Sequence, residues 1–286
     1  MSQIKTKKVG NKVINVKTRR DQKRKRAKNM LRYRNKESDR SSFRQLLRAT
    51  DYTWKSSDRY LGIYDSLISR QVEVVDFCKG QDVGSPIRLH DYSLALTQVY
   101  LHRALSLYVG AFQALASNNI YLMTLSIRGY LESVAGMGFL YKKLDSHQQG
   151  NIDDEALDKF LIKLLFGTKD QKLLDEVGND DFTAINVMSM LDEADKAFNS
   201  KIMNGDVPDK KMLRTVYEWL CEFCHPNYDS ASLSFELDKE KQVLVFKHNQ
   251  SEVNELEGKL IQDVFIASYA LLTMYDQVVV IAKSLK

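Results

Sequence analysis

The chain is poor in residues that interrupt or cross-link a polypeptide. Only 3 prolines and 13 glycines occur among its 286 residues, which favours long uninterrupted elements, helices above all. The 3 cysteines, Cys78, Cys221 and Cys224, cannot form a disulfide framework, and this scarcity fits a reducing compartment. No apolar stretch follows the basic amino terminus, as a signal peptide would require. We therefore expect a cytoplasmic protein built mainly from helices.

Two long apolar runs, residues 94–116 and 120–141, have the length of membrane spans. However, Arg103 lies inside the first run, and Arg128 and Glu132 lie inside the second. Charges at the middle of a span are costly in lipid, so buried helices at the centre of a bundle fit these runs better. We therefore expect no membrane among the partners of this protein.

The net charge of +5 conceals a sharp division of the chain. Residues 1–48 hold 18 Lys and Arg against 3 Asp and Glu, whereas residues 49–286 hold 24 against 34. The first segment also has few large apolar residues and no clear period, which is typical of a disordered or partly helical arm. We therefore predict a basic arm over residues 1–48 and a helical-bundle domain over residues 49–286.

The cations of the arm are densest between residues 19 and 34. Such a segment binds RNA or DNA mainly by releasing counterions from phosphates, with little preference for sequence. A solvated tail, an intramolecular partner for the acidic body and a nuclear type of targeting signal are the alternatives. The side chains expected to bind nucleic acid are Arg19, Arg20, Lys23, Arg24, Lys25, Arg26, Lys28, Arg32 and Arg34.

Helical periodicity begins near residue 51 and continues to the carboxyl terminus with one interruption. Alternation at residues 233–237, a polar turn at 238–241 and an apolar run at 243–246 predict a short β-hairpin. The sequence therefore predicts an all-α, multi-helix bundle with one short β-hairpin before the C-terminal helix, and Asp91 as the cap of its second helix. Helices are expected at about residues 57–79, 91–117, 120–144, 153–166, 171–177, 182–199 and 206–225, and from 251 onward.

The string CEFCH at residues 221–225 has the form of a c-type haem attachment sequence, and its thiols and imidazole could also hold zinc. Both cysteines, however, continue an apolar stripe of helical period that includes Tyr217 and Leu220. Zinc needs about four ligands, and the other cysteine in the chain has no paired spacing around it. We therefore expect two ordinary core cysteines, no metal and no cofactor.

Arg128 and Glu132 are spaced i, i+4 on an otherwise apolar helix. A buried pair of this kind must be hydrogen-bonded, so it is either a structural latch or the lining of a polar pocket together with His225. His102 and Arg103 on the preceding helix could join either arrangement. Small residues along the same helix indicate that another helix approaches it closely: Gly129, Ala135, Gly136 and Gly138.

The sequence His-Pro-Asn at residues 225–227 ends the helix that carries the CEFCH string. Pro226 disfavours helical geometry at the residue before it, so this helix should end near His225. The side chains of His225 and Asn227 are then expected to cap carbonyl groups. This prediction makes Pro226 and Asn227 a structural corner between the helix and the hairpin.

The order of these pieces resembles bacterial members of the HEPN-like superfamily, and it is closest to an uncharacterised helical-bundle branch. The order is Arg-x-x-x-Glu on a central apolar helix, Tyr-x-x-Leu before His-Pro-Asn, a short hairpin and a terminal helix. The likeness covers about residues 51–286 and excludes the arm. The matching residues are Arg128, Glu132, Tyr217, Leu220, His225, Pro226 and Asn227.

The resemblance implies a homodimer and a place in toxin–antitoxin or antiviral defence systems, where many HEPN domains are metal-independent RNases. Their nuclease motif is an Arg followed, after four to six residues, by His. At those positions before His225 this chain has Glu218, Trp219 and Leu220 instead, and Arg214 is too far away. The branch that this chain resembles therefore lacks the usual nuclease motif.

These observations predict a nucleic-acid-associated helical protein that acts as a binding or regulatory component of a bacterial defence or stress system. Its partners would be RNA or DNA through the arm, a second copy of the chain, and a protein of that system. One alternative is a metal-independent RNase that uses His225 with Arg128 and Glu132 as catalytic residues. The other alternative is a structural subunit whose acidic surface and arm serve protein contacts only.

Overall fold

The computed structural model describes residues 37–72, 75, 88–177, 182–202, 211–246 and 253–285. The chain divides into two compact units, residues 1–45 and 46–286. Residues 37–47 are helical, and the second unit is a bundle of helices with a single two-stranded antiparallel sheet among its described residues. The predicted fold class, all-α with a short hairpin before the C-terminal helix, is therefore confirmed.

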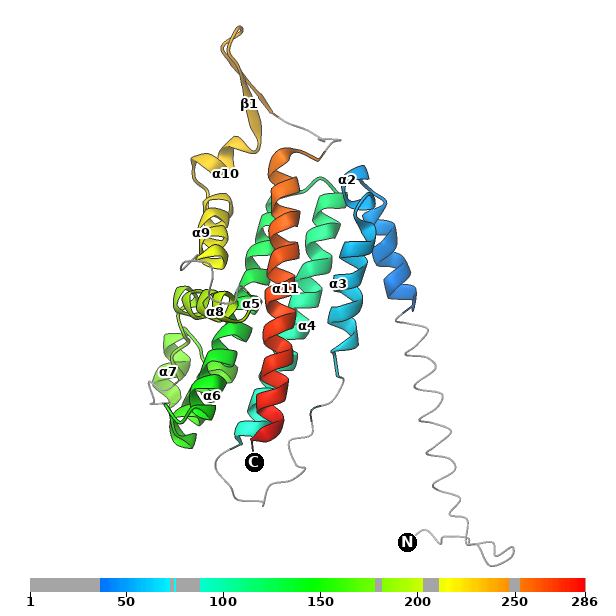
Figure 1. Ribbon diagram of the computed structural model, residues 1–286. Coiled ribbons are helices and arrows are strands. Elements are labelled where there is room, and N and C mark those ends of the chain that lie inside the picture. The colour runs from blue at the N-terminus through cyan, green and yellow to red at the C-terminus, as the bar shows by residue number, and fades with distance from the viewer. Residues whose placement is uncertain are drawn as a thin grey trace, which may run out of the picture. The chain divides into compact units, whose positions relative to one another are not determined.

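Three long helices form the centre of the second unit: α4 (Leu89–Ala116), α5 (Ile120–Gln148) and α11 (Glu255–Ser284). Figure 1 shows them running side by side, with α3 (Ser57–Ser69) next to α4 and α11. Buried tyrosines within this core make hydrogen bonds from one helix to another through their hydroxyl groups. Tyr108 donates to the carbonyl of Tyr60 at 3.0 Å, and Tyr130 shares a hydrogen bond with Ser268 at 2.7 Å. These bonds satisfy polar groups that would otherwise be buried without a partner.

The turn between α4 and α5 lies at the two asparagines that the sequence places there. Asn118 adopts a φ of 53°, in the left-handed region that asparagine tolerates better than most residues. The side chain of Asn119 then accepts a hydrogen bond at 3.0 Å from the backbone N–H of Leu122 and caps α5. Two helices of opposite direction are thereby joined without a long loop.

The close approach predicted from small residues on α5 is confirmed, and the neighbouring element is α8 (Val187–Ile202). A Cβ atom at Gly138 would lie 2.6 Å from the Cα atom of Ala194 and 3.0 Å from the sulfur of Met274 on α11. At Gly136, a Cβ atom would be 2.5 Å from the ring of Tyr100 on α4. The lack of side chains at these two positions lets three elements pack on one stretch of α5.

Several predicted helix bounds are wrong, and tertiary contacts explain two of them. The helix predicted to reach residue 79 ends at Ser69, because the Arg70 carbonyl accepts hydrogen bonds from Tyr275 at 3.0 Å and Gln98 at 3.1 Å. Most of residues 73–87 lies outside the described residues. Likewise α8 begins at Val187 rather than 182, because Thr183 forms a bridge with Thr168.

Other predicted bounds differ at the ends of the central helices. Helix α4 begins at Leu89, so Asp91 lies in its first turn and is not its cap. Helix α5 continues to Gln148, beyond the predicted end at residue 144. The helices α6 (Asp154–Phe166) and α7 (Gln171–Val177) agree with prediction. The short helix α2 (Asp51–Trp54), capped by Thr50, was not predicted.

Helix α9 (Met212–Cys224) begins on a carboxylate that another helix supplies. Both oxygens of the buried Asp195, on α8, accept from the first turn of α9: 2.8 Å to the backbone N–H of Leu213 and 3.1 Å to that of Arg214. Free N–H groups at a helix start normally receive a cap from the residue just before it. Here the cap comes from tertiary structure, so α8 fixes where α9 lies.

The hairpin consists of β1 (Phe235–Asp238) and β2 (Val243–Phe246), with Phe235 opposite Phe246. It follows α10 (Tyr228–Ser232), a short helix that was not predicted, and it extends beyond the end of the bundle in Figure 1. Its turn closes where the Asp238 side chain accepts from the N–H groups of Glu240 and Lys241, both at 3.1 Å. The apolar side chains of β2 are exposed and do not belong to the core.

Helix α11 begins at a capping box. The Asn254 side chain accepts from the N–H of Glu257 at 2.9 Å, and the Glu257 side chain accepts from the N–H of Asn254 at the same distance. Within the part of the chain that is described, α11 is the one helix long and apolar enough to cross a membrane. Because 56% of its apolar window is buried in the bundle, its composition is also what a central core helix requires.

Candidate functional site

A polar cluster lies where α5 meets α9, and it contains two of the residues predicted from sequence. Two guanidinium nitrogens of Arg128 donate to the hydroxyl oxygen of Tyr217, at 3.1 and 3.0 Å. That hydroxyl in turn donates to Glu132 at 3.2 Å. The guanidinium of Arg128 also lies 5.2 Å from the centre of the Tyr217 ring. The direct separation of Arg128 and Glu132 is longer, 3.9 Å, so Tyr217 is the group that joins them.

The strongest ion pair of Glu132 is made with a different helix. Arg103 on α4 donates to Glu132 at 2.8 Å and to the hydroxyl of Ser133 at 3.1 Å. His102 does not join the cluster, because its Nε2 lies 3.2 Å from the carbonyl of Val72. The cluster therefore ties α4, α5 and α9 together through one carboxylate between two guanidinium groups.

Burial sets the protonation of the groups at the α9 side of the cluster. Burial raises the pKa of Tyr217, and the hydrogen bond from Arg128 offsets this only in part. The same factors act on Cys221, whose pKa burial raises and the charge of Arg128 partly lowers. Tyr217 is therefore a neutral hydroxyl donor and Cys221 a protonated thiol at neutral pH, and neither is set up as a nucleophile.

His225 lies apart from this cluster. It is the C-cap of α9, with an extended backbone that the following proline requires, so the predicted end of this helix is confirmed. Its side chain is exposed, and over the described residues no hydrogen bond or ion pair joins it to Arg128 or Glu132. Eight residues separate it from Tyr217, which corresponds to about 12 Å along a helix. In the part of the chain that the structure describes, His225 therefore has no direct contact with Arg128 or Glu132 through which the three predicted catalytic residues could exchange a proton.

The corner after α9 is organised by Asn227. Its side-chain oxygen accepts from the N–H of Ser230 at 3.1 Å and caps α10, while its amide donates to Glu222 at 2.6 Å. The N–H of Asn227 also reaches across Pro226 to the carbonyl of His225 at 2.8 Å. Asn227 thus caps N–H groups of the next helix rather than carbonyl groups of α9.

The cysteines of the CEFCH string are half-buried free thiols. Within the ranges that the structure describes, no three His, Cys, Asp or Glu side chains are placed to hold a metal ion. Cys78 lies outside those ranges. Cys221 faces Arg128, and its neighbourhood is that of a packed helix interface.

Replacing Tyr217 by Phe is expected to lower the free energy of unfolding by about 1–2 kcal/mol, because Arg128 and Glu132 lose the hydroxyl that joins them. Urea unfolding followed by circular dichroism measures this change. Tyr228→Phe is the matched control, since Tyr228 is 80% exposed and loses no hydrogen bond to the described residues. Equal stability of the two variants would show that the Tyr217 hydroxyl contributes nothing to the docking of α9.

The predicted nucleic-acid-binding residues of the arm, from Arg19 to Arg34, lie outside the described residues. The second unit carries cations that sequence analysis did not single out. Arg48 lies 4.9 Å from the ring centre of Trp54, and Arg59 lies 4.7 Å from that of Phe265 on α11. The sequence does show aromatic residues interleaved with Lys and Arg over positions 48–60, which could have indicated this group of cations. Phe265, the aromatic partner of Arg59, is distant in the sequence and could not be predicted.

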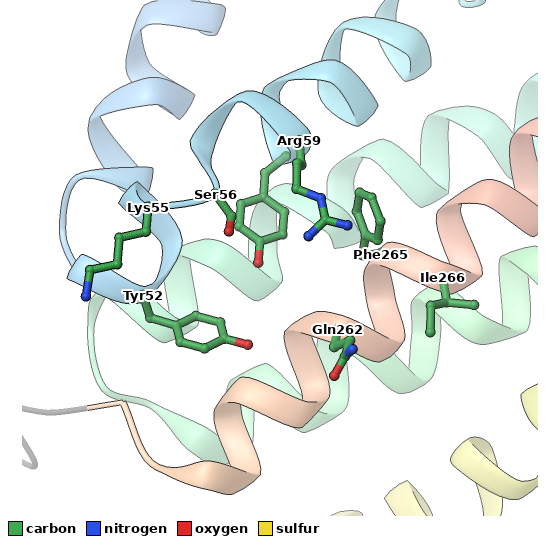
Figure 2. Close-up of a pocket in the computed structure, with 8 residues that line it drawn as sticks. Tyr52, Lys55, Ser56, Arg59, Gln262, Phe265 and Ile266 are labelled. Atoms are coloured by element: carbon green, nitrogen blue, oxygen red, sulfur yellow. The ribbon is translucent and has the colours of Figure 1, made fainter.

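A pocket of about 560 Å³ lies among α2, α3 and α11. Figure 2 shows Arg59 beside the ring of Phe265, the Tyr52 hydroxyl directed toward α11, and Lys55 extending away at the rim. The lining side chains are cationic, aromatic, aliphatic or neutral polar, and they include no carboxylate: Tyr52, Lys55, Ser56, Arg59, Tyr60, Gln262, Phe265 and Ile266.

Comparisons of the chain with protein-family models, with curated proteins and with solved structures found no match. The resemblance to HEPN-like proteins therefore stays a prediction.

Proposed function

We propose that this protein binds RNA or DNA. The basic arm of residues 1–48 makes most of the contacts with the nucleic acid and so links it to the helical bundle. The observation that carries the proposal is the division of charge. The arm holds 18 Lys and Arg against 3 Asp and Glu, while the rest of the chain is acidic in balance. A segment this basic attracts polyanions, and an acidic body does not by itself retain them.

The surface that follows the arm in sequence supports the same function. Lys55 and Arg59 have no carboxylate within ion-pair distance among the described residues, in contrast to Arg70, Arg103 and Arg214. The exposed ring of Tyr52 lines the same pocket as these two cations, and the exposed ring of Trp54 lies beside Arg48. Cations interleaved with aromatic rings are the usual composition of a surface for single-stranded nucleic acid.

The remaining expectations are proposals with separate tests. A homodimer, a protein partner in a bacterial defence or stress system and a cytoplasmic location follow from the HEPN-like resemblance and the cysteine content. The RNase alternative requires that labelled RNA become shorter in the presence of the protein and that His225→Ala stop this. The interaction-subunit alternative requires that no nucleic acid bind at all.

The proposed function is tested by measuring how affinity depends on salt. Fluorescence anisotropy of a labelled RNA or DNA oligonucleotide, titrated with the full chain, gives the dissociation constant at each salt concentration. If the nine arm cations contact phosphates, affinity falls by at least ~1,000-fold between 50 and 200 mM salt. A change of less than about tenfold over that range would mean that phosphate contacts do not drive binding, and no binding at 50 mM would refute the proposal.

A further inference from the structure

The pocket among α2, α3 and α11 has the size and composition of a ligand site. Its volume of about 560 Å³ falls within the range of roughly 300–1,000 Å³ that small-molecule sites occupy. Arg48, the last basic residue of the arm sequence, precedes Tyr52 by four positions. The occupant of the pocket can be inferred from the groups that line it.

The positive charge of the pocket favours an anionic ligand. The guanidinium carbon of Arg59 lies over the ring of Phe265, 4.7 Å from the ring centre. The side chain of Arg59 donates no hydrogen bond within the described residues, so its N–H groups are available to a phosphate oxygen. Lys55 adds a second positive charge at the rim, and the lining residues contribute no negative charge to cancel either cation.

The aromatic lining of the pocket favours a ligand that contains a flat ring. Tyr52 is 41% exposed, and its hydroxyl donates to the carbonyl of Gly258 at 2.9 Å. A Cβ atom at Gly258 would lie 3.3 Å from the Tyr52 ring, so glycine lets the ring rest against α11. Tyr60 also lines the pocket but is only 7% exposed, so Tyr52 is the ring that a base can reach. A ring fixed in this way can stack against a base with little loss of side-chain entropy.

Gln262 supplies the remaining group that a nucleotide needs. Its side chain is exposed, lines the pocket and makes no hydrogen bond within the described part of the chain. A free amide offers both a donor and an acceptor, as the edge of a base requires. Cation, ring and amide thus lie around one cavity in the combination that a phosphate joined to a base would fill.

We infer that this pocket receives one unpaired nucleotide of a single strand, with its phosphate at Arg59 and Lys55 and its base on the Tyr52 ring. A base inside a duplex has both faces covered by its neighbours and cannot enter the pocket. The arm therefore binds nucleic acid of either form, and the pocket adds a preference for single strands. This inference rests on the proposed function and extends it by naming the form of nucleic acid that the body recognises.

The test compares a labelled single-stranded oligonucleotide with a duplex of the same sequence, both bound to the full chain. Arg59→Gln and Tyr52→Leu are each expected to weaken binding of the single strand about tenfold and to leave duplex binding unchanged. Lys239→Gln is the control for net charge, because Lys239 is exposed in the turn between β1 and β2 and does not line the pocket. Circular dichroism establishes that both variants remain folded, since Tyr52→Leu loses the hydrogen bond to Gly258 and Arg59→Gln loses the contact with Phe265.

The outcomes separate this inference from the proposed function. Equal affinity for single strand and duplex, unchanged by Arg59→Gln and Tyr52→Leu, overturns the pocket while leaving the arm in place. A loss that is the same for both forms shows Arg59 to be a general phosphate contact and also overturns it. Absence of salt-sensitive binding by the unaltered chain refutes the proposed function itself.

Discussion

Replacing all nine cations between Arg19 and Arg34 by glutamine lowers the affinity for RNA and DNA at least ~100-fold at 100 mM salt. Each phosphate contact releases about one counterion, so removing several of them reduces both the affinity and its dependence on salt. The effect is large because the rest of the chain, with 24 Lys and Arg against 34 Asp and Glu over residues 49–286, repels a polyanion on average.

The matched control keeps the net charge of residues 19–34 and changes the order of the residues. A variant in which residues 19–34 are shuffled, with the same composition, is expected to bind as tightly as the original chain, because counterion release depends on charge and not on sequence. Anisotropy titrations at several salt concentrations compare the three proteins. If the shuffled arm lost affinity as the glutamine arm does, the segment would contain a specific motif and the electrostatic account would be wrong.

Gly138→Val is expected to lower the free energy of unfolding by ~3 kcal/mol or more, since a side chain there has no space between α5 and α8. Its Cβ atom would lie 2.6 Å from the Cα atom of Ala194, and backbone atoms cannot rotate away as a flexible side chain can. For a domain of this size the melting temperature should fall by roughly 6–12 °C. Displacement of α8 would also displace Asp195, which caps α9.

Gly62→Ala provides the opposite result at a comparable position. Gly62 is exposed in the middle of α3, and a Cβ atom there meets nothing within 4 Å. Alanine should therefore raise stability by about 0.5–1 kcal/mol through its better helix propensity. Thermal unfolding followed by circular dichroism compares both variants with the original chain. A Gly138→Val protein that melts at the original temperature would contradict the close packing of α5 on α8.

The fold was largely predictable because its signals are local. Hydrophobic periodicity indicated the long central helices and the break between residues 117 and 120, and Pro226 indicated the end of α9. The predicted helix ends that were wrong lie where a side chain distant in the sequence forms a hydrogen bond with the backbone. The hydrogen bonds from Tyr275 and Gln98 to the carbonyl of Arg70 are an example, since no residue near position 70 indicates them.

The candidate sites were less predictable because their partners come from separate helices. Periodicity put Arg128 and Glu132 on one face of α5 but could not reveal that Tyr217 joins them or that Arg103 supplies the closest ion pair. The sequence allowed His225 to share a polar pocket with Arg128 and Glu132, yet His225 is exposed at the end of α9 while the other two are half-buried.

The amino-acid sequence by itself determined the class of the fold, the division between a basic arm and an acidic body, and the faces of the helices that are apolar. Those properties depend on composition and on spacing within one segment. The tertiary structure alone decided which faces meet, and so produced the cluster around Glu132, the capping of α9 by Asp195 and the pocket beside Arg59. Helical spacing fixes the direction of a side chain around its own axis, but the neighbour that it meets depends on the packing of the whole bundle.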